Sequence, residues 1–536
     1  MGNQLQNLDY LVFLAYFLIV AGYGYWIYQR KKTANTSATD FFLAEGALTW
    51  WAIGASLIAS NISAEQFIGM SGSGFAMGLA IASYEWMAAA TLLVVAVFFM
   101  PGYITNRIFT MPQFLEKRYS PLVATMMAVF WLLVYVFVNL TSILYLGAIA
   151  VSTISGFSFT ACAIFLAVFA IIITLGGMKV IGYTDVIQVA ILVLGGLATT
   201  YLALDLVAQQ FGGQGMWTGL GLLRQQAPDH FHMIFDESNA HYKDLPGLTV
   251  LIGAMWIANL NYWGCNQYIT QRALGANLNT ARNGLLFASF LKLLMPIIVV
   301  IPGIAAYVLF QKGLFQSELV NAAGEVKPDK AYPVLLNLLG PGLKGLSFAA
   351  LTAAIVASLA GKANSIATIF TLDIYNKYMD KTAGEDKQVR IGRWVIIAAM
   401  FIAILVAPQL QKLEQGFQFI QDFTGLISPG VVAIFLLGFF WKRATANAAF
   451  AAALVTIPLG LVFKAWLPQV PFLDRMGWVF LVLVALMVII SLIDPKSKDN
   501  PKAMRVDAAM FRTSPSFTLG ALLVIGVLAA LYIVFW

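Results

Sequence analysis

The chain has 536 residues, of which 60% are hydrophobic and only 11% are charged, and its mean hydropathy is +0.81. Soluble domains carry about 25% charged residues, so this composition excludes a soluble protein and indicates a polytopic membrane protein. The two cysteines, Cys162 and Cys265, both lie in apolar segments, which excludes a disulfide framework. The net charge of +7 comes from short basic clusters between apolar runs, so nucleic acid is not an expected partner.

Apolar stretches of about 20 residues predict fourteen membrane-spanning helices, which makes the expected fold all-α. The first stretch, from Tyr10 to Trp26, lacks a basic leading region and a small-residue cleavage site, so it is interpreted as a retained helix. The predicted spans start near residues 8, 49, 79, 121, 158, 183, 247, 284, 343, 391, 416, 444, 475 and 516.

The loops between the predicted spans alternate in charge, and this alternation predicts the orientation of the chain. Basic residues gather in 30–32, 107–118, 377–393 and 496–512, whereas acidic residues gather in 229–244 and 318–329. Lys and Arg accumulate on the cytoplasmic side of membrane proteins. Both termini are therefore expected to face outside.

The segment from Ile58 to Phe75, reading IASNISAEQFIGMSGSGF, begins inside a predicted span and then becomes polar and glycine-rich. Hydrocarbon tolerates such a backbone only where protein buries it or a water-filled cavity borders it. A polar break in a spanning helix is typical of the binding site of a secondary transporter. A re-entrant or loop segment between two short helices is the alternative interpretation.

Other function classes find little support in the sequence. No P-loop fingerprint occurs in the loops predicted to be cytoplasmic, so these loops contain no ATP-binding motif that could drive a pump. No nucleophile–base pair or metal cluster can be assembled, which disfavours an enzyme. His230 and His232 form an H-x-H pair beside Asp229, and packing or loop chemistry fits this pair better than a metal site.

Charged residues at membrane depth are costly and usually functional, and they are accompanied here by amides. The charged set is Glu85, Asp185, Lys292 and Lys362, and the amide set is Gln66, Asn139, Asn259, Asn261 and Gln421. This mixture of donors and acceptors suits a polyhydroxylated solute, because each sugar hydroxyl both donates and accepts. Aromatic faces such as Tyr262 and Phe417 would cover the apolar side of a sugar ring. Alternatively, Glu85 and Lys292 simply pair with each other, or Lys292 reaches an interface.

At these residues the chain resembles the sodium:solute symporters, and within them the sodium/galactose and sodium/glucose transporters. The resemblance runs from about Asp9 to Trp536. It is carried by the strings GASLIASNISAEQFIGMSGSGF, IASYEWM, FVNLTSILYLG, TDVIQV, ANLNYWGCNQYITQR, ATIFTLDIY and FTGLISPG.

The resemblance implies a core of two inverted five-helix repeats, each with an interrupted first helix, in a multi-pass protein of the bacterial inner membrane. The implied divisions are an extra helix and cytoplasmic loop at 1–48, repeat 1 at 49–208, an outer loop at 209–246, repeat 2 at 247–440 and three further helices at 441–536.

The resemblance also implies a sugar site, in which Tyr262 would form an inner gate and Asn61 and Asn139 would support the site or its gate. The other members would be Gln66, Met70, Tyr84, Glu85, Asn259, Lys292, Phe417 and Gln421. The galactose transporter of the family has a serine where this chain has Ala88, so one hydroxyl contact is absent and the preferred hexose is left open.

Sodium requires five or six hard oxygens, and an unwound helix supplies backbone carbonyls for this purpose. The resemblance implies carbonyl ligands at Ala59, Ile62 and Ala354 and two hydroxyls on the helix near 343–375. Those hydroxyl positions read Ala357 and Ser358 here, so one hydroxyl is missing, and water or Ser60 would have to replace it. Asp185 is implied as the nearest acid of the ion pathway.

Lys362 lies four residues after Ser358, on the same helical face, where the galactose transporter has an apolar residue. Its ammonium would either disturb the sodium position or reach into an inner vestibule about 6 Å nearer the cytoplasm. Both interpretations stay open at this point.

The sequence thus predicts a secondary active transporter, in which sodium drives symport of a hexose by alternating access through the lipid bilayer. The alternative is sodium-independent or proton-coupled sugar transport, because of Ala357 and Lys362. A sugar sensor on the same scaffold would require a cytoplasmic signalling extension, and the inner loops are short. No partner protein is indicated.

Overall fold

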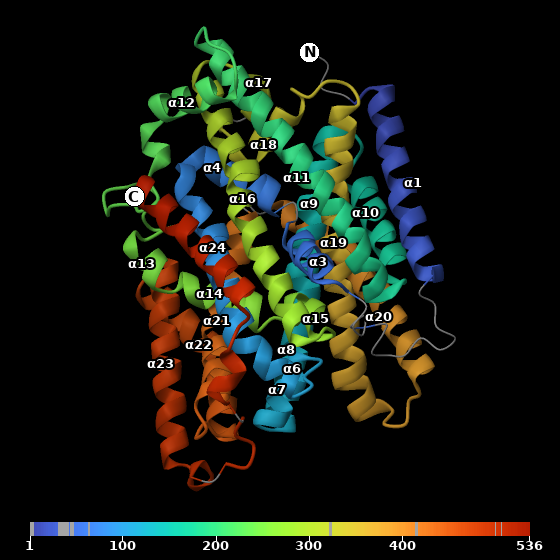
Figure 1. Ribbon diagram of the computed structural model, residues 1–536, viewed down its shortest axis with the longest axis vertical. Coiled ribbons are helices and arrows are strands. Elements are labelled where there is room, and N and C mark those ends of the chain that lie inside the picture. Colours follow the sequence, from blue (N-terminus) through green and yellow to red (C-terminus); the bar gives the residue numbers. More distant parts are fainter. Residues whose placement is uncertain are drawn as a thin grey trace.

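A computed structural model describes residues 5–30, 42, 48–62, 65–320, 324–412, 416–498, 500–504 and 506–536. Within these ranges, ten helices are long and apolar enough to cross a membrane, and two shorter apolar helices cover Phe159–Thr174 and Thr424–Phe440. Together with two interrupted helices, they account for the fourteen predicted spans. The predicted all-α polytopic class is confirmed, and Figure 1 shows the helices as one bundle.

Helices cover most of the described N-terminal half. They are α1 (Asn7–Arg30), α3 (Trp50–Asn61), η1 (Glu65–Met70), α4 (Ser71–Met77), η2 (Gly78–Ala82), α5 (Ser83–Val94), η3 (Val95–Phe99), α6 (Met100–Thr105), α7 (Met111–Arg118), α8 (Pro121–Val134), η4 (Tyr135–Leu140), α9 (Thr141–Ser155), α10 (Phe159–Thr174), α11 (Gly177–Gln210), α12 (Met216–Gln226) and η5 (Pro228–Phe231).

The described C-terminal half continues in the same way. Its helices are α13 (Leu248–Ile252), α14 (Met255–Gly264), α15 (Gln267–Leu274), α16 (Leu278–Gln311), α17 (Gln316–Leu319), η6 (Pro328–Lys330), α18 (Ala331–Leu336), α19 (Leu343–Thr368), η7 (Ile369–Met379), α20 (Glu385–Val406), η8 (Ala407–Lys412), α21 (Gly416–Phe440), α22 (Ala446–Trp466), α23 (Phe472–Ile493), η9 (Pro495–Ser497), η10 (Ala508–Phe511) and α24 (Pro515–Val534).

The first interrupted helix is the one that begins with α3. Its α-helical part stops at Asn61, and Ile62 adopts an extended backbone conformation with φ −76° and ψ 99°. The chain resumes in the wide π-helical turn η1 and then in α4. The break predicted after Ile58 is therefore present, and it leaves the last carbonyls of α3 without helical partners.

Glycines let α4, the second part of this broken helix, pack closely on α16. A Cβ atom on Gly74 would lie 2.8 Å from the carbonyl oxygen of Val300, and one on Gly303 would lie 2.1 Å from that of Ser71. Such contacts are sterically forbidden, so any larger residue would push the two helices apart. The glycine-rich half of the predicted break thus serves helix packing.

The second interrupted helix comprises α13, α14 and α15. Gly253 separates α13 from α14, and the pair Cys265–Asn266 separates α14 from α15. Asn266 is extended, with φ −106° and ψ 119°, and its side-chain oxygen accepts a hydrogen bond from the Tyr268 N–H, which caps α15. This break lies beside the first one, because α15 packs against both α3 and α19.

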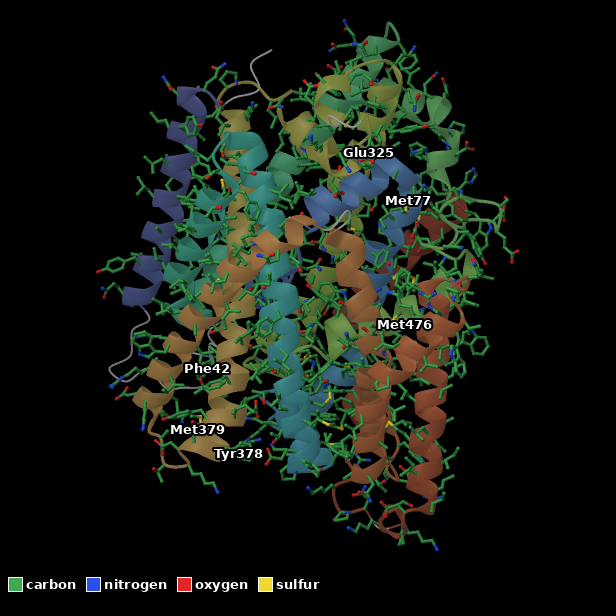
Figure 2. All side chains as sticks on the ribbon, turned by 180° about the vertical axis from the view of Figure 1, so that it is seen from behind. Phe42, Met77, Glu325, Tyr378, Met379 and Met476 are labelled. Carbon is green, nitrogen blue, oxygen red and sulfur yellow. The ribbon has the colours of Figure 1, made fainter. Side chains whose placement is uncertain are left out.

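The long helices α11, α16 and α19 enclose the two breaks, and α24 runs obliquely across α5 and α16 (Figure 1). The loops separate into two ends of the bundle. Figure 2 shows Glu325 and Met77 toward one end and Tyr378 and Met379 toward the opposite end. The acidic loops predicted to be outside and the basic loops predicted to be cytoplasmic therefore lie at opposite ends.

Candidate solute and ion site

A cavity of about 150 Å³ lies where α3 ends. It is lined by parts of both interrupted helices and by α5, α8, η4, α9, α16, α19 and α21. Its lining is Ser60, Asn61, Gln66, Met70, Tyr84, Glu85, Ala88, Phe130, Trp131, Val134, Tyr135, Asn139, Ile143, Ala258, Asn259, Asn261, Tyr262, Trp263, Asn266, Tyr268, Lys292, Lys362, Thr424 and Ile427.

The cavity contains nine of the eleven residues predicted for the sugar site, although they come from distant parts of the sequence. These nine are Asn61, Gln66, Met70, Tyr84, Glu85, Asn139, Asn259, Tyr262 and Lys292. The side chains of the other two, Phe417 and Gln421, lie outside the described part of α21. Ala88 also lines the cavity, so the missing hydroxyl falls on the wall of the predicted sugar site.

Two charged residues that line the cavity, Lys292 and Glu85, form one cluster. The Lys292 ammonium, on α16, lies 2.5 Å from a Glu85 carboxylate oxygen on α5 and also donates to the side-chain oxygen of Asn61. Lys292 is 1% exposed and Glu85 is 3% exposed. The pairing considered as an alternative for Glu85 and Lys292 is therefore present, but the pair also faces the cavity. Lys292 rests 5.1 Å above the Trp263 ring, which further favours the ammonium there.

The amides of the cavity are held in defined orientations by neighbouring groups. Asn259 donates to the carbonyl of Met255, one turn earlier on α14, at 3.0 Å. Asn261 donates to the Ser428 hydroxyl of α21 at 2.9 Å. A fixed donor direction leaves the amide oxygen available to a bound hydroxyl group, because an amide both donates and accepts. The arrangement can therefore bind a neutral molecule rich in hydroxyl groups.

Two of the predicted ion ligands, Ala59 and Ser358, meet at the end of α3, on the side that faces α19. The Ser358 hydroxyl lies 3.3 Å from the Ala59 carbonyl and 3.0 Å from the Ser60 carbonyl, to which it donates. Ala354 is buried one turn earlier on α19, and Ile62 is the extended residue of the break. Ala357 is 1% exposed and adds a methyl group where a second hydroxyl was expected.

Asp185, on α11, belongs to a separate cluster around Ser56, which lies about one helical turn before these carbonyls on α3. Its carboxylate accepts a hydrogen bond of 2.5 Å from the Ser56 hydroxyl. The Arg272 guanidinium donates to the same hydroxyl oxygen at 3.0 Å and to the Ser56 carbonyl at 3.1 Å. Ser56 thus links an acid on α11 to a base on α15. The structure places Asp185 next to α3, but the hydroxyl that donates a hydrogen bond to its carboxylate is that of Ser56 and not that of Ser358.

Tyr268 is a residue of this site that the sequence reasoning did not single out. Its hydroxyl donates to the Ser60 carbonyl and lies 3.4 Å from the Ser358 carbonyl. It therefore holds the second broken helix against the end of the first. The string ANLNYWGCNQYITQR indicates the position of Tyr268, because this tyrosine follows directly on a polar break. Its hydrogen-bond partner, 208 positions away, could not be predicted from the sequence.

Lys362 does not reach an inner vestibule in this structure. Its side chain is 3% exposed, and its ammonium lies 3.7 Å from the centre of the Tyr268 ring and 4.4 Å from that of Tyr135. It also donates to the side-chain oxygen of Asn139 at 3.4 Å. The vestibule interpretation is thus not what the structure has, and the ammonium lies at the cavity wall against Tyr268, whose hydroxyl contacts the Ser60 carbonyl.

Comparisons with known proteins show the family to which the chain belongs. The model of the sodium:solute symporter family matches residues 41–456, and the chain belongs to that family. The chain is 47% identical over 541 residues to a sodium/glucose cotransporter of Vibrio parahaemolyticus, covering 100% of this chain and 99% of the relative. It is 34% identical over 485 residues to sodium/myo-inositol cotransporter 2 of Homo sapiens, covering 85% of this chain and 69% of the relative.

A solved structure supports the fold. A sodium-coupled sialic acid symporter in a substrate-bound, outward-open state matches with a TM-score of 0.78 at 22% sequence identity. The match covers 91% of this chain and 98% of that chain. The chain is therefore a multi-pass membrane protein built on the architecture of a sodium-coupled symporter.

Proposed function

We propose that this protein is a secondary active transporter that couples the inward movement of sodium to the symport of a hexose, galactose or glucose. The observation that carries the proposal is the cavity in which Lys292, Glu85 and Asn61 meet beside the amides Asn259 and Gln66. These groups supply donors and acceptors at fixed positions, as a sugar with several hydroxyl groups requires. Kinship with a bacterial sodium/glucose cotransporter supports the same solute class.

The coupling follows from the shared end of α3. Asn61 belongs to the polar cluster of the cavity, while the carbonyls of Ala59 and Ser60, one and two residues earlier, face the Ser358 hydroxyl. Sodium bound at these carbonyls would fix the end of α3 and so would order Asn61 and its partner Lys292. Sodium and the sugar would thus each favour the same ordered end of α3, so the binding of one would strengthen the binding of the other.

We further propose that the protein lies in the bacterial inner membrane with both termini outside, and that it moves solutes without transforming them chemically. The basic loops near 377–393 and 496–512 would then face the cytoplasm, as the positive-inside rule requires. The ranges 49–208 and 247–440 would be the inverted repeats, since each begins with an interrupted helix.

Uptake into proteoliposomes tests the proposal. Labelled galactose and glucose are offered with an inward sodium gradient, with potassium in place of sodium, and with a proton gradient alone. We expect accumulation of at least one hexose with the sodium gradient only. Accumulation that persists unchanged without sodium would refute sodium coupling. Uptake of another solute, with neither hexose taken up, would refute the sugar assignment.

A further inference from the structure

Among the described residues that line the cavity, Lys362 is the one charged residue that the proposed sugar and ion sites do not use. Its ammonium is enclosed by the faces of Tyr268 and Tyr135 at 3.7 Å and 4.4 Å, together with the Asn139 side-chain oxygen at 3.4 Å. Aromatic faces attract a cation through the negative face of the ring. This surrounding is therefore suited to keeping a positive charge on Lys362 within the protein.

Tyr268 connects this charge to the proposed sodium ligands. The ring face of Tyr268 holds the ammonium, and its hydroxyl donates to the Ser60 carbonyl at the end of α3. The Ser358 hydroxyl donates to the same carbonyl and to that of Ala59. One phenol ring and one hydrogen bond therefore separate the ammonium from the carbonyls of α3.

We infer that Lys362 is a positioning residue that lowers the sodium affinity of this transporter and thereby sets the sodium concentration at which it works. Two effects act in the same direction. The fixed positive charge repels a bound sodium ion, and it also draws electron density from the Tyr268 ring, which strengthens the hydrogen bond of its hydroxyl to Ser60. Both effects favour the arrangement in which the Tyr268 hydroxyl, and not sodium, occupies the Ser60 carbonyl.

The size of the effect follows from the separation of the two charges. Across at most about 10 Å, with an effective dielectric constant of about 20, the repulsion of two unit charges corresponds to roughly a tenfold change in a binding constant. The absence of the second hydroxyl at Ala357 acts in the same direction, so the chain departs from a tight sodium site at two neighbouring positions of α19. The inference rests on the sodium coupling proposed above.

The test measures equilibrium binding of radioactive sodium to the purified full-length protein in the absence of sugar. Lys362→Met and Lys362→Gln remove the charge, Lys362→Arg keeps it, and Lys344→Met makes the same change at a buried lysine 18 residues earlier on α19. We expect Lys362→Met and Lys362→Gln to bind sodium about tenfold more tightly than the natural protein. Lys362→Arg and Lys344→Met should change sodium affinity less than twofold.

A second measurement separates this role from a role in sugar binding. At saturating sodium, Lys362→Gln should bind galactose or glucose within about threefold of the natural protein. Unchanged or weaker sodium binding by both neutral variants would overturn the inference while leaving sodium-driven sugar uptake by the natural protein intact. Loss of sugar binding at every sodium concentration would also overturn it, because Lys362 would then belong to the sugar site. Natural protein and variants that all bind no sodium would refute the proposed sodium coupling itself.

Discussion

The two sides of the break at the end of α3 present different kinds of polar atoms. On the cavity side, the polar groups are side chains from α3, α5, α14 and α16, such as Asn61, Glu85 and Lys292. On the α19 side, they are mainly backbone carbonyls of Ala59 and Ser60, which accept from the hydroxyls of Ser358 and Tyr268. A side-chain site depends on residue identity, whereas a backbone site depends on where the helix ends. Substitutions should therefore affect the two sides to different extents.

The largest effect is expected on the cavity side, from Lys292→Ala. This change removes a proposed donor to the sugar and leaves Glu85 buried without its cation, and breaking a buried pair in this way costs about 3–5 kcal/mol. Affinity for galactose or glucose, measured by calorimetry at saturating sodium, should fall at least about 100-fold. Lys344→Ala, at a buried lysine of α19 away from the cavity lining, is the matched control.

Unchanged sugar binding by Lys292→Ala would contradict the site. The double variant Glu85→Gln/Lys292→Met separates the two causes, because it restores charge balance without the ammonium donor. We expect it to fold as stably as the natural protein in thermal unfolding and still to bind sugar poorly.

Ser358→Ala should give the next largest effect, and on the other side of the break. It removes a hydroxyl that contacts the carbonyls of Ala59 and Ser60, and loss of one buried polar partner costs about 1–3 kcal/mol. Sodium binding should weaken by about tenfold to a hundredfold, while sugar affinity at saturating sodium changes less than about threefold. Ser347→Ala, another buried serine of α19, is the control. Equal losses for sodium and sugar would remove the distinction between the two sides.

Ala357→Ser should have a smaller effect and in the opposite direction. It restores a hydroxyl next to Ser358 and adds a hard oxygen of the type that sodium prefers. Sodium should then bind about threefold to tenfold more tightly, because one further ligand is worth roughly the net value of one hydrogen bond. Ala353→Ser places the same hydroxyl one turn earlier, at a position that packs against α1 residues. If Ala357→Ser weakened sodium binding while Ala353→Ser left it unchanged, position 357 would not face the ion.

The smallest effect concerns the far end of the broken helix and varies with pH. A ring nitrogen of His230 lies 3.0 Å from the Phe75 carbonyl, near the end of α4, and the ring stacks on Tyr307. Burial lowers the pKa of His230 below its ordinary value of 6.5, although the Phe75 carbonyl and Asp229 partly oppose this shift and His241 adds to it. A lowered pKa means that protonation destabilises the folded state, so stability should be lost as pH falls below 6.5 and through the folded-state pKa.

Thermal unfolding at several pH values checks this effect. Between pH 7.5 and pH 5, the natural protein should lose about 1 °C more in unfolding temperature than His230→Phe, which keeps the stacked ring and cannot titrate. Sugar and sodium affinities should be unaffected by the substitution. An identical pH dependence of the two proteins would show that His230 contributes nothing to the acid sensitivity of the protein.

Much of the site could be predicted from the sequence because polar groups in a membrane are exceptional. Hydropathy alone indicates the spans, and the cost of burying a charge in a membrane predicts a functional role for Glu85 and Lys292. The break after Ile58 was readable because a polar, glycine-rich backbone cannot face lipid. The contact of Tyr268 could not be predicted, because aromatic residues are common in apolar helices. Nothing in the local sequence distinguishes a tyrosine that donates to a carbonyl 208 positions away.

The sequence by itself determined the class of protein, the number of predicted spans, the interrupted helix and the inventory of polar groups, since each follows from local composition and periodicity. Only the tertiary structure decided which groups meet. It brought Lys292 to Glu85 and Asn61 across 207 and 231 positions, and it placed the Lys362 ammonium on Tyr268 instead of in a vestibule. Such contacts depend on how helices cross and pack, and that geometry is set by the whole bundle and not by any one segment.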